Sequence, residues 1–516
     1  MDPTEPGGRP PLPGRPAPPP AVPWTDPGDR APADDQQATG GDAPDWTTGG
    51  QGTAAGPPAW ATRGPSGPPS GEGWPGWEPP AGPPARRRRV GWVVALVAVL
   101  VAALVVGVLA LRPGARVEPS QQAAGRRPSA AAAPDPRVEV PKLLARRAQA
   151  VLRGDRAAFL ATVDRRRTRY YRDQATLFAR LRTVPFAAVA YRLSDRRDLA
   201  TATVRRRYAP DRVYLPQVQA RYRFKGQDAS PVLGRLYYTF VLSPSGWRVG
   251  GQGDAQPAWR DDVEIWDGGP VRTLRSARTL VVYHPGGERL ADRLLQAAER
   301  AYGEVAATWP DRWERKVVIL APRDEREAER LVHARDLSKV AALASSSVES
   351  GPVERVLGNR IVVNSTVLGR YDPLNFQTVV THEMTHVATR SLGNGIPLFL
   401  VEGFADYTAL RPLRFPLRLT RPTLAERVGA GRFDGRLPST RELRGPDGVL
   451  AYEESSSFCL WVAETFGEGR LRGLYRAFAG SAPPSAAELE LGFRRTLGVS
   501  RRTAEARWAA WVRGRL

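Results

Sequence analysis

Apolar residues are spread unevenly along the chain, and their pattern divides it into three zones. Residues 1–85 hold few branched aliphatic residues and are dominated by Pro, Gly, Ala, Asp and Thr. Such a segment cannot bury enough apolar surface to offset the entropy of ordering, so we expect a disordered cytoplasmic tail. A continuous apolar run follows, and mixed periodic patterns begin near residue 138.

The apolar run covers residues 90–111 without one charged residue and follows four arginines at 86–89. As a helix it would cross the hydrocarbon core of a bilayer, about 30 Å thick. Basic residues favour the cytoplasmic side of a membrane. We therefore expect a single transmembrane helix with a basic flank over 86–112. The N-terminus would be cytoplasmic, and the domains after a stalk at 113–136 would be extracytoplasmic, at the cell membrane.

The remaining pattern predicts an α+β fold class with two folded domains. In the first, residues 137–258, two helices precede an antiparallel sheet. Its expected strands are 187–193, 201–208, 218–224, 236–242 and 246–250. The segment 152–164 resembles the opening of cystatin-like, nuclear-transport-factor-two-like domains. The resemblance implies a cone-shaped sheet that serves as a spacer or binding domain.

A different order of elements begins after residue 259 and defines the second domain, 259–516. Alternating patterns predict strands and helices in turn, and the C-terminal half is mostly helical. The expected strands are 279–283, 316–321, 343–348 and 360–364, and the expected helices are 288–309 and 324–334.

Asp372 and Pro373 mark the start of a helix that carries two histidines. Asp is a favoured N-cap, and Pro suits the first helical position. His382 and His386 are four residues apart, so both imidazoles leave one face of the helix and can reach one Zn²⁺. Glu383 lies beside the first ligand, close enough to touch a metal-bound water. The whole chain has 4 histidines, so this spacing seldom arises by chance; the plainer alternative is a surface helix with solvated histidines.

A second helix is expected just downstream, where Glu402 begins the sequence Glu-Gly-Phe-Ala-Asp-Tyr. A catalytic zinc needs a third protein ligand and an open position, and Glu402 supplies the ligand. Asp406 lies one turn further on and would accept a hydrogen bond from a ligand imidazole. A solvated acidic face is the alternative, but Leu400, Phe404 and Ala405 crowd the same segment.

Together the two motifs resemble the gluzincin branch of the peptidase MA clan, over about 200 residues. The resemblance implies a Zn²⁺ cofactor, with Glu402 as third ligand, Asp406 behind a ligand and Glu383 as general base. In similar families a Tyr near the place of Tyr452 faces the zinc and would donate to the oxyanion. The alternative of a half-buried core tyrosine stays open. The spacing from His386 to Glu402 is shorter than in thermolysin, so only the clan-level mechanism is implied.

These features predict a membrane-anchored zinc peptidase that acts on peptides or proteins through a metal-activated water. The alternative is a catalytically weak or inactive extracytoplasmic binding or sensor protein, against which the intact Glu383 argues. By the same resemblance, strand 360–364 would be the edge that pairs with the substrate backbone. His284 and His333 lie outside the motifs and are expected to be ordinary surface or turn histidines.

The charge of the chain bears on its binding partners and not on the reaction. The net charge is +22, and arginine carries nearly all of the positive charge. No basic stretch carries interleaved aromatics, so we expect no specific nucleic-acid binding. Contact of arginine with anionic lipid or cell wall is the remaining option. Heavy Arg, Ala, Gly and Pro usage is typical of a GC-rich bacterial genome, and Cys459 as the only cysteine excludes an intramolecular disulfide.

Overall fold

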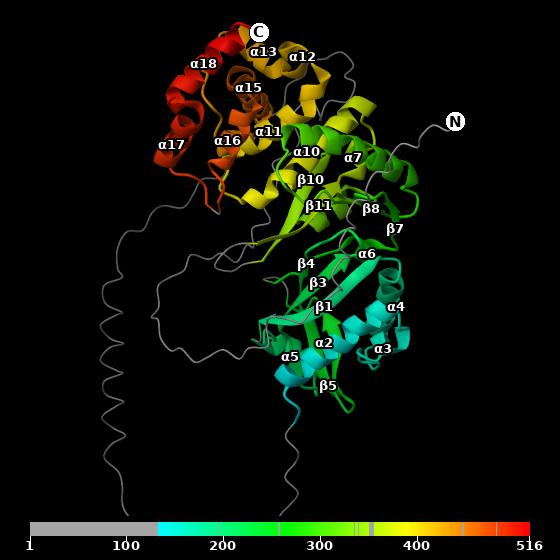
Figure 1. Cartoon of the computed structure of the whole chain (residues 1–516). Helices are drawn as coiled ribbons and strands as arrows, with labels where there is room; N and C mark the ends of the chain where they lie inside the picture. The colour runs from blue at the N-terminus through cyan, green and yellow to red at the C-terminus, as the bar shows by residue number, and fades with distance from the viewer. Residues whose placement is uncertain are drawn as a thin grey trace, which may run out of the picture. The chain divides into compact units, whose positions relative to one another are not determined.

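The protein is represented by a computed structural model that describes residues 133–516, except for 196, 256–258, 335, 339, 350–354, 446, 447 and 481. Helices and strands are mixed along this part of the chain (Figure 1). The predicted tail, the predicted span and nearly all of the predicted stalk lie outside the described residues.

The predicted fold class was wrong in its membrane component. Among the residues described, no helix is both long and apolar enough to cross a membrane. The longest of them, α7 (Glu288–Thr308), has 21 residues but carries arginines and carboxylates on its outer face. The fold class is therefore corrected to a mixed arrangement of helices and strands. The same finding contradicts the predicted single-pass membrane location, and the run at 90–111 itself lies outside the described residues.

The first folded region begins with α2 (Pro136–Arg153), α3 (Arg156–Leu160) and α4 (Thr168–Leu181). Asp155 caps α3, because its carboxylate accepts the backbone N–H of Ala158 at 2.9 Å. The strands form two three-stranded sheets, ordered β1-β3-β4 and β2-β5-β6. Their bounds are β1 (Phe186–Asp195), β2 (Val213–Tyr214), β3 (Gln217–Phe224), β4 (Val232–Leu236), β5 (Tyr238–Ser243) and β6 (Gly246–Gln252).

The strand predicted over 201–208 is instead a helix, α5 (Ala202–Tyr208). Thr201 caps it, since its hydroxyl oxygen accepts the backbone N–H of Val204 at 3.3 Å. Val204 and Tyr208 are both buried and lie four residues apart, which places them on one helical face. The capping threonine and this spacing outweigh the alternation that favoured a strand.

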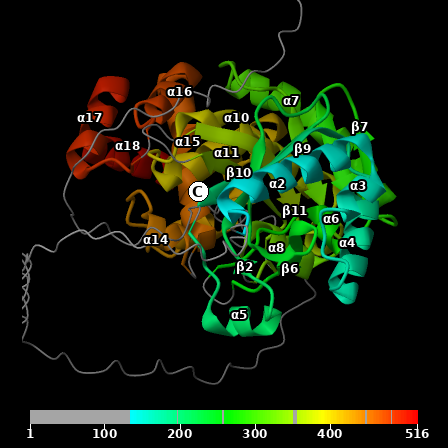
Figure 2. The ribbon, with the colours of Figure 1, turned by 90° about the horizontal axis from the view of Figure 1, so that it is seen from below.

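The second region is built on a five-stranded sheet with the order β10-β11-β9-β8-β7. Strand β10 is therefore one edge of the sheet, and β11, which contains residues 360–363, lies inside it, so the prediction of 360–364 as an edge strand was wrong. Helices α7 and α10 pack together beside this sheet (Figures 1 and 2). The strand bounds are β7 (Arg272–Arg275), β8 (Thr279–Tyr283), β9 (Val317–Ala321), β10 (Ala342–Glu349) and β11 (Arg355–Val363).

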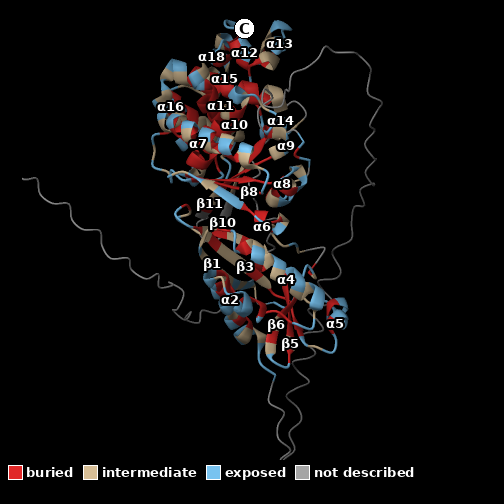
Figure 3. Ribbon diagram, turned by 90° about the vertical axis from the view of Figure 1, so that its right-hand side faces the viewer, coloured by how far each residue is buried: buried red, intermediate tan, exposed pale blue. Residues whose placement is uncertain are grey.

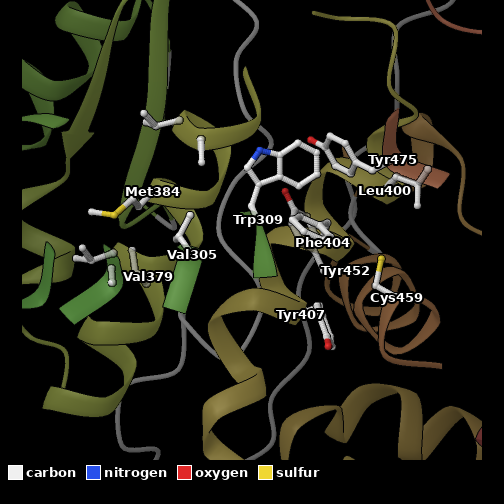
Figure 4. Packing of buried hydrophobic residues seen from close by; sticks show 14 of the residues in the cluster. Val305, Trp309, Val379, Met384, Leu400, Phe404, Tyr407, Tyr452, Cys459 and Tyr475 are labelled. Atoms are coloured by element: carbon white, nitrogen blue, oxygen red, sulfur yellow. The ribbon is translucent and has the colours of Figure 1, made fainter. Parts of the chain in front are cut away.

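The C-terminal half is helical, as predicted, and three of its helices form the interior. They are α10 (Pro373–Thr389), α11 (Leu398–Leu410) and α15 (Gly448–Phe466), and each is mostly buried (Figure 3). Trp309, Phe404 and Tyr475 pack edge to face or tilted at ring distances of 5.2–5.6 Å (Figure 4). The remaining helices include α8 (Glu325–Val332), α13 (Pro422–Gly429), α16 (Glu468–Arg476), α17 (Ala486–Leu497) and α18 (Arg501–Arg513).

Buried polar contacts connect the two regions. Arg360 of β11 forms an ion pair with Asp228 at 2.7 Å, and its guanidinium lies 4.8 Å from the ring centre of Phe224. Gln227 donates its side-chain amide to the backbone oxygen of Val317 at 3.0 Å. The predicted domain boundary near 258 stays a prediction.

Candidate metal centre

Helix α10 carries the two histidines into the protein interior. Asp372 caps it as predicted, accepting the backbone N–H groups of Leu374 and Asn375 at 2.9 and 3.0 Å. Four buried threonines would otherwise bring unpaired hydroxyls into the core. Each donates its hydroxyl to the carbonyl oxygen four residues earlier: Thr378, Thr381, Thr385 and Thr389. The helix can therefore be buried although its sequence is polar, because these hydroxyls all have hydrogen-bond partners.

Helix α11 brings Glu402 and Asp406 against α10, and Gly403 sets how closely α15 approaches it. A Cβ at position 403 would lie 2.5 Å from the backbone oxygen of Ser455 in α15. A side chain there would push the two helices apart, because a backbone carbonyl cannot swing away. Glycine therefore allows α15 to place Tyr452 beside the carboxylates of α11.

The three predicted ligands converge on one point. The two Nε2 atoms of His382 and His386 are 3.0 Å apart, and they lie 3.3 and 3.4 Å from Oε2 of Glu402. A tetrahedral zinc ion with bonds of about 2.0–2.1 Å separates its ligand atoms by about 3.3 Å. The three edges of this triangle therefore fit a tetrahedral metal ion, and these residues form the only such group among the described ones.

The hydrogen bond behind His382 favours the same conclusion. Nδ1 of His382 lies 2.8 Å from Oδ1 of Asp406, so the ring donates its Nδ1 proton to the carboxylate. The lone pair of Nε2 then faces the carboxylate of Glu402, whose two oxygens accept no hydrogen bond from the described residues. Two acceptors at this distance need a cation between them, either a proton or a metal ion.

The electrostatics of the buried cluster point to a cation as well. Burial lowers the pKa of His382, but the carboxylates of Asp406, Glu402 and Glu383 outweigh it and hold the pKa well above its usual range. Burial raises the pKa of Glu402, but His386 and His382 outweigh it and lower the pKa to about 2. The site therefore keeps Glu402 ionised and holds positive charge at His382.

Glu383 lies beside this triangle without joining it. Its Oε2 atom is buried and has no hydrogen-bond partner in the described part of the chain. Burial and the Glu402 carboxylate raise the pKa of Glu383, while the two histidines and a backbone hydrogen bond from Ala344 of β10 lower it; the net pKa is raised. A buried carboxylate with a free oxygen and a raised pKa suits proton transfer.

Tyr452 is buried in the main core cluster and not half-buried. Its hydroxyl forms no hydrogen bond with a described residue. Burial and then the carboxylates of Glu402, Asp406 and Glu383 raise the pKa of Tyr452 well above its usual value, so the hydroxyl stays protonated. The structure thus brings a proton donor next to the metal ligands, and its role in catalysis stays a prediction.

The cleft in front of the site has a volume of about 400 Å³ and contains residues that the sequence did not single out. His386 and Glu402 line it together with Ala344 and Ser345 of the edge strand and Tyr475 of α16. The Tyr475 hydroxyl lies 3.1 Å from the hydroxyl of Thr389. No motif marks Tyr475 or Ala344, because each reaches the site through tertiary packing alone.

The two histidines outside the motif, His284 and His333, contact other residues than those of this cluster. His284 is buried, contrary to the expectation of a surface position, and its Nε2 lies 2.9 Å from Oε1 of Glu327. His333 ends α8 with a left-handed backbone and contacts Asp262 at 3.1 Å. Neither contributes to the metal triangle.

The solved structures to which this chain is similar include a hydrolase and a zinc metallopeptidase. Native yeast LTA4 hydrolase matches with a TM-score of 0.31 and 11% identity, over 47% of this chain and 39% of that chain. A variant of an M1 zinc metallopeptidase from Deinococcus radiodurans matches with a TM-score of 0.27 and 13% identity, over 64% of this chain and 71% of that chain. The chain thus spans well under half of the yeast enzyme. No protein family and no curated protein matches the sequence. These TM-scores carry no argument about function, which depends on the site itself.

Proposed function

We propose that this protein is a gluzincin-like zinc peptidase that hydrolyses peptide or protein substrates. The observation that carries the proposal is the triangle of His382, His386 and Glu402, whose ligand atoms lie 3.0–3.4 Å apart. Zinc favours this mixture of imidazole and carboxylate ligands, and three protein ligands leave a fourth position open. Glu383 beside the triangle distinguishes a catalytic site from a structural one.

A zinc ion held there would activate a water molecule and polarise the scissile carbonyl. Glu383, through its unpaired Oε2 atom, would take up a proton from a water molecule at this site and would later pass it to the leaving amine. Asp406 keeps the Nδ1 proton on His382 and so keeps Nε2 available as a ligand. Tyr452 donates its hydroxyl to the developing oxyanion.

The position of the cleft beside strand β10 supports an extended substrate that reaches the edge of the sheet. Strand β10 is the edge and shares Ala344 and Ser345 with the cleft. An unpaired edge offers backbone N–H and C=O groups, so a peptide can add to it as a further strand. A peptide bound in this way would have its scissile bond within reach of both the edge strand and the metal ligands.

Metal analysis of the purified full chain and cleavage of a mixed peptide library test the proposal together. We expect about one zinc per chain and cleavage that a chelator abolishes and added zinc restores. A well-folded preparation without zinc after incubation with the metal would refute the proposal. Zinc-bound protein that cleaves no peptide would favour a binding or sensor protein instead.

A further inference from the structure

A second hollow lies against helix α11, apart from the metal cleft. It has a volume of about 530 Å³ and is enclosed by the end of α11, the turn η3 (Arg411–Leu413), α12 (Leu417–Thr420), α15 and the C-terminal residues. None of the residues that line it also lines the metal cleft. The proposed peptidase chemistry makes no use of this hollow.

Arginine dominates its lining. Arg411, Arg414, Arg421 and Arg515 face the hollow, and Glu464 is the one acidic residue among those that line it. Two of the arginines are compensated: Arg411 pairs with Glu468 at 2.7 Å, and Arg515 pairs with Glu464 at 2.9 Å. Arg414 and Arg421 form no ion pair with any residue that the structure describes. The hollow therefore carries uncompensated positive charge.

Arg421 is the unusual member, because its guanidinium is buried at 3% exposure. Its Nε and Nη1 atoms donate to the hydroxyl oxygens of Ser456 and Thr420, at 3.2 and 2.6 Å. These acceptors are neutral. Burial lowers the pKa of Arg421, and the more distant carboxylates of Asp406 and Glu453 offset only part of this effect. A buried cation that lacks a direct counter-ion is costly, and an anion in the hollow would supply one.

The guanidinium groups also determine which anion fits. Arginine presents a planar fork of N–H donors that matches the oxygens of phosphate and binds them in pairs. Arg414 is solvent-exposed and free of hydrogen bonds within the described chain, so its fork is available at the mouth. At the floor, Nε and Nη1 of Arg421 are engaged, and Nη2 makes no hydrogen bond with a described residue. A phosphate group between the two would meet donors from both ends.

We propose that this hollow is a binding site for a phosphate group, with Arg421 as its floor and Arg414 at its mouth. The phosphate belongs either to a small soluble molecule or to a lipid headgroup, since both present the same oxygens. Arg411 and Arg515 add to the positive field without leaving their carboxylate partners.

Calorimetric titration of the full chain with inorganic phosphate at constant ionic strength tests the site. We expect saturable binding with one phosphate per chain. The Arg414→Gln variant should weaken it by about tenfold or more, as loss of a charged hydrogen bond does. Arg432→Gln is the matched control, because Arg432 is also exposed but does not line the hollow; it should bind like the wild type. Arg421→Met should abolish binding, and Arg414→Gln keeps the test valid if the buried substitution unfolds the protein.

Phosphate can also ligate zinc, so the titration is repeated on His386→Ala. Retained binding there separates this site from the metal centre and from the fate of the proposed peptidase function. Flotation with neutral vesicles, with and without phosphatidic acid, identifies the source: Arg414-dependent flotation indicates a lipid headgroup, and its absence beside phosphate binding indicates a soluble ligand. No phosphate binding by the wild type, equal binding by Arg414→Gln, or loss only in His386→Ala would overturn the proposal.

Discussion

Helix α11 presents two faces to charged surroundings, and they differ in sign and in construction. On one face Glu402 and Asp406 meet the histidines of α10, and the closest contacts lie between 2.8 and 3.4 Å. Elsewhere on α11, Tyr407 and Leu410 border the arginine-lined hollow. Each face holds a buried charged group: Glu402 faces the two histidines but accepts no hydrogen bond from a described residue, and Arg421 donates only to neutral hydroxyls.

The difference shows two ways in which a chain assembles a charged site. The metal face draws its groups from two adjacent helices at fixed helical spacing, so its geometry follows from the sequence. The arginine face draws one residue at a time from α11, the turns after it and the C-terminal end. Its arginine side chains are also longer than the side chains of the metal face, and they restrict one another's positions less. The metal face should therefore respond sharply to single substitutions.

Removal of a ligand should have the largest effect. His386→Ala takes away one corner of the triangle, so zinc is lost and hydrolysis falls to the uncatalysed rate, a change of at least about 10⁶-fold. Metal analysis and library cleavage measure this. His333→Ala is the matched control, since His333 contacts Asp262 and not the triangle. Zinc retained in His386→Ala would mean that the ligands have been misassigned.

Removal of the base should come next. Glu383→Gln keeps the shape and the hydrogen-bonding reach of the side chain but cannot take up a proton. We expect the variant to keep its zinc and to lose about 10²–10⁴-fold in kcat, since general-base catalysis has that value. Glu426→Gln, at an exposed position, should leave kcat unchanged. A Glu383→Gln variant as active as the wild type would remove Glu383 from the mechanism.

Most of the metal face could be predicted from sequence, and the arginine face could not. His382, His386, Glu402 and Asp406 lie on two helices whose periodicity, N-cap and turn are local signals, so their meeting is nearly fixed once both helices form. Arg421 shows the contrary case: nothing in its neighbours distinguishes it among so many arginines. Its importance arises from burial against Ser456, which tertiary packing alone provides.

The same distinction explains the errors in the fold. Strands β8 and β9 were predicted to within one residue, because apolar runs reflect burial directly, whereas β11 begins earlier than predicted, at Arg355, and β7 was not predicted. The segment at 201–208 was predicted as a strand and is a helix, because the Thr201 cap and the burial of Val204 and Tyr208 on one helical face favour the helix. The edge position of β10 depends on strand order, and no local pattern records that order.

A smaller effect should follow from the group behind the ligand. Asp406→Asn keeps a hydrogen-bond acceptor at His382 but removes the charge that favours the ligating tautomer. We expect zinc affinity to fall by about 10–100-fold, with near-normal hydrolysis at saturating zinc. Competition with a chelator measures the affinity. Unchanged zinc affinity would show that the 2.8 Å contact between Asp406 and His382 has no role in metal binding.

The smallest and most graded effect should be the pH dependence of the metal face. The carboxylates around His382 hold its pKa well above the usual value, so zinc must displace a proton from the imidazole. Zinc affinity should therefore rise by about tenfold per pH unit from about pH 6.5 upward until the raised pKa is passed.

The metal-free protein should show the opposite sign. A raised pKa in the folded state contributes stability below the unfolded pKa of histidine, about 6.5, and loses that contribution as pH rises through the folded value. The melting temperature of the zinc-free protein should thus fall with increasing pH. Added zinc should raise the melting temperature more at high pH than at low pH. Asp406→Asn should flatten both slopes, because it removes a carboxylate that raises the pKa of His382. Equal slopes in the two proteins would show that the protonation of another group controls metal binding.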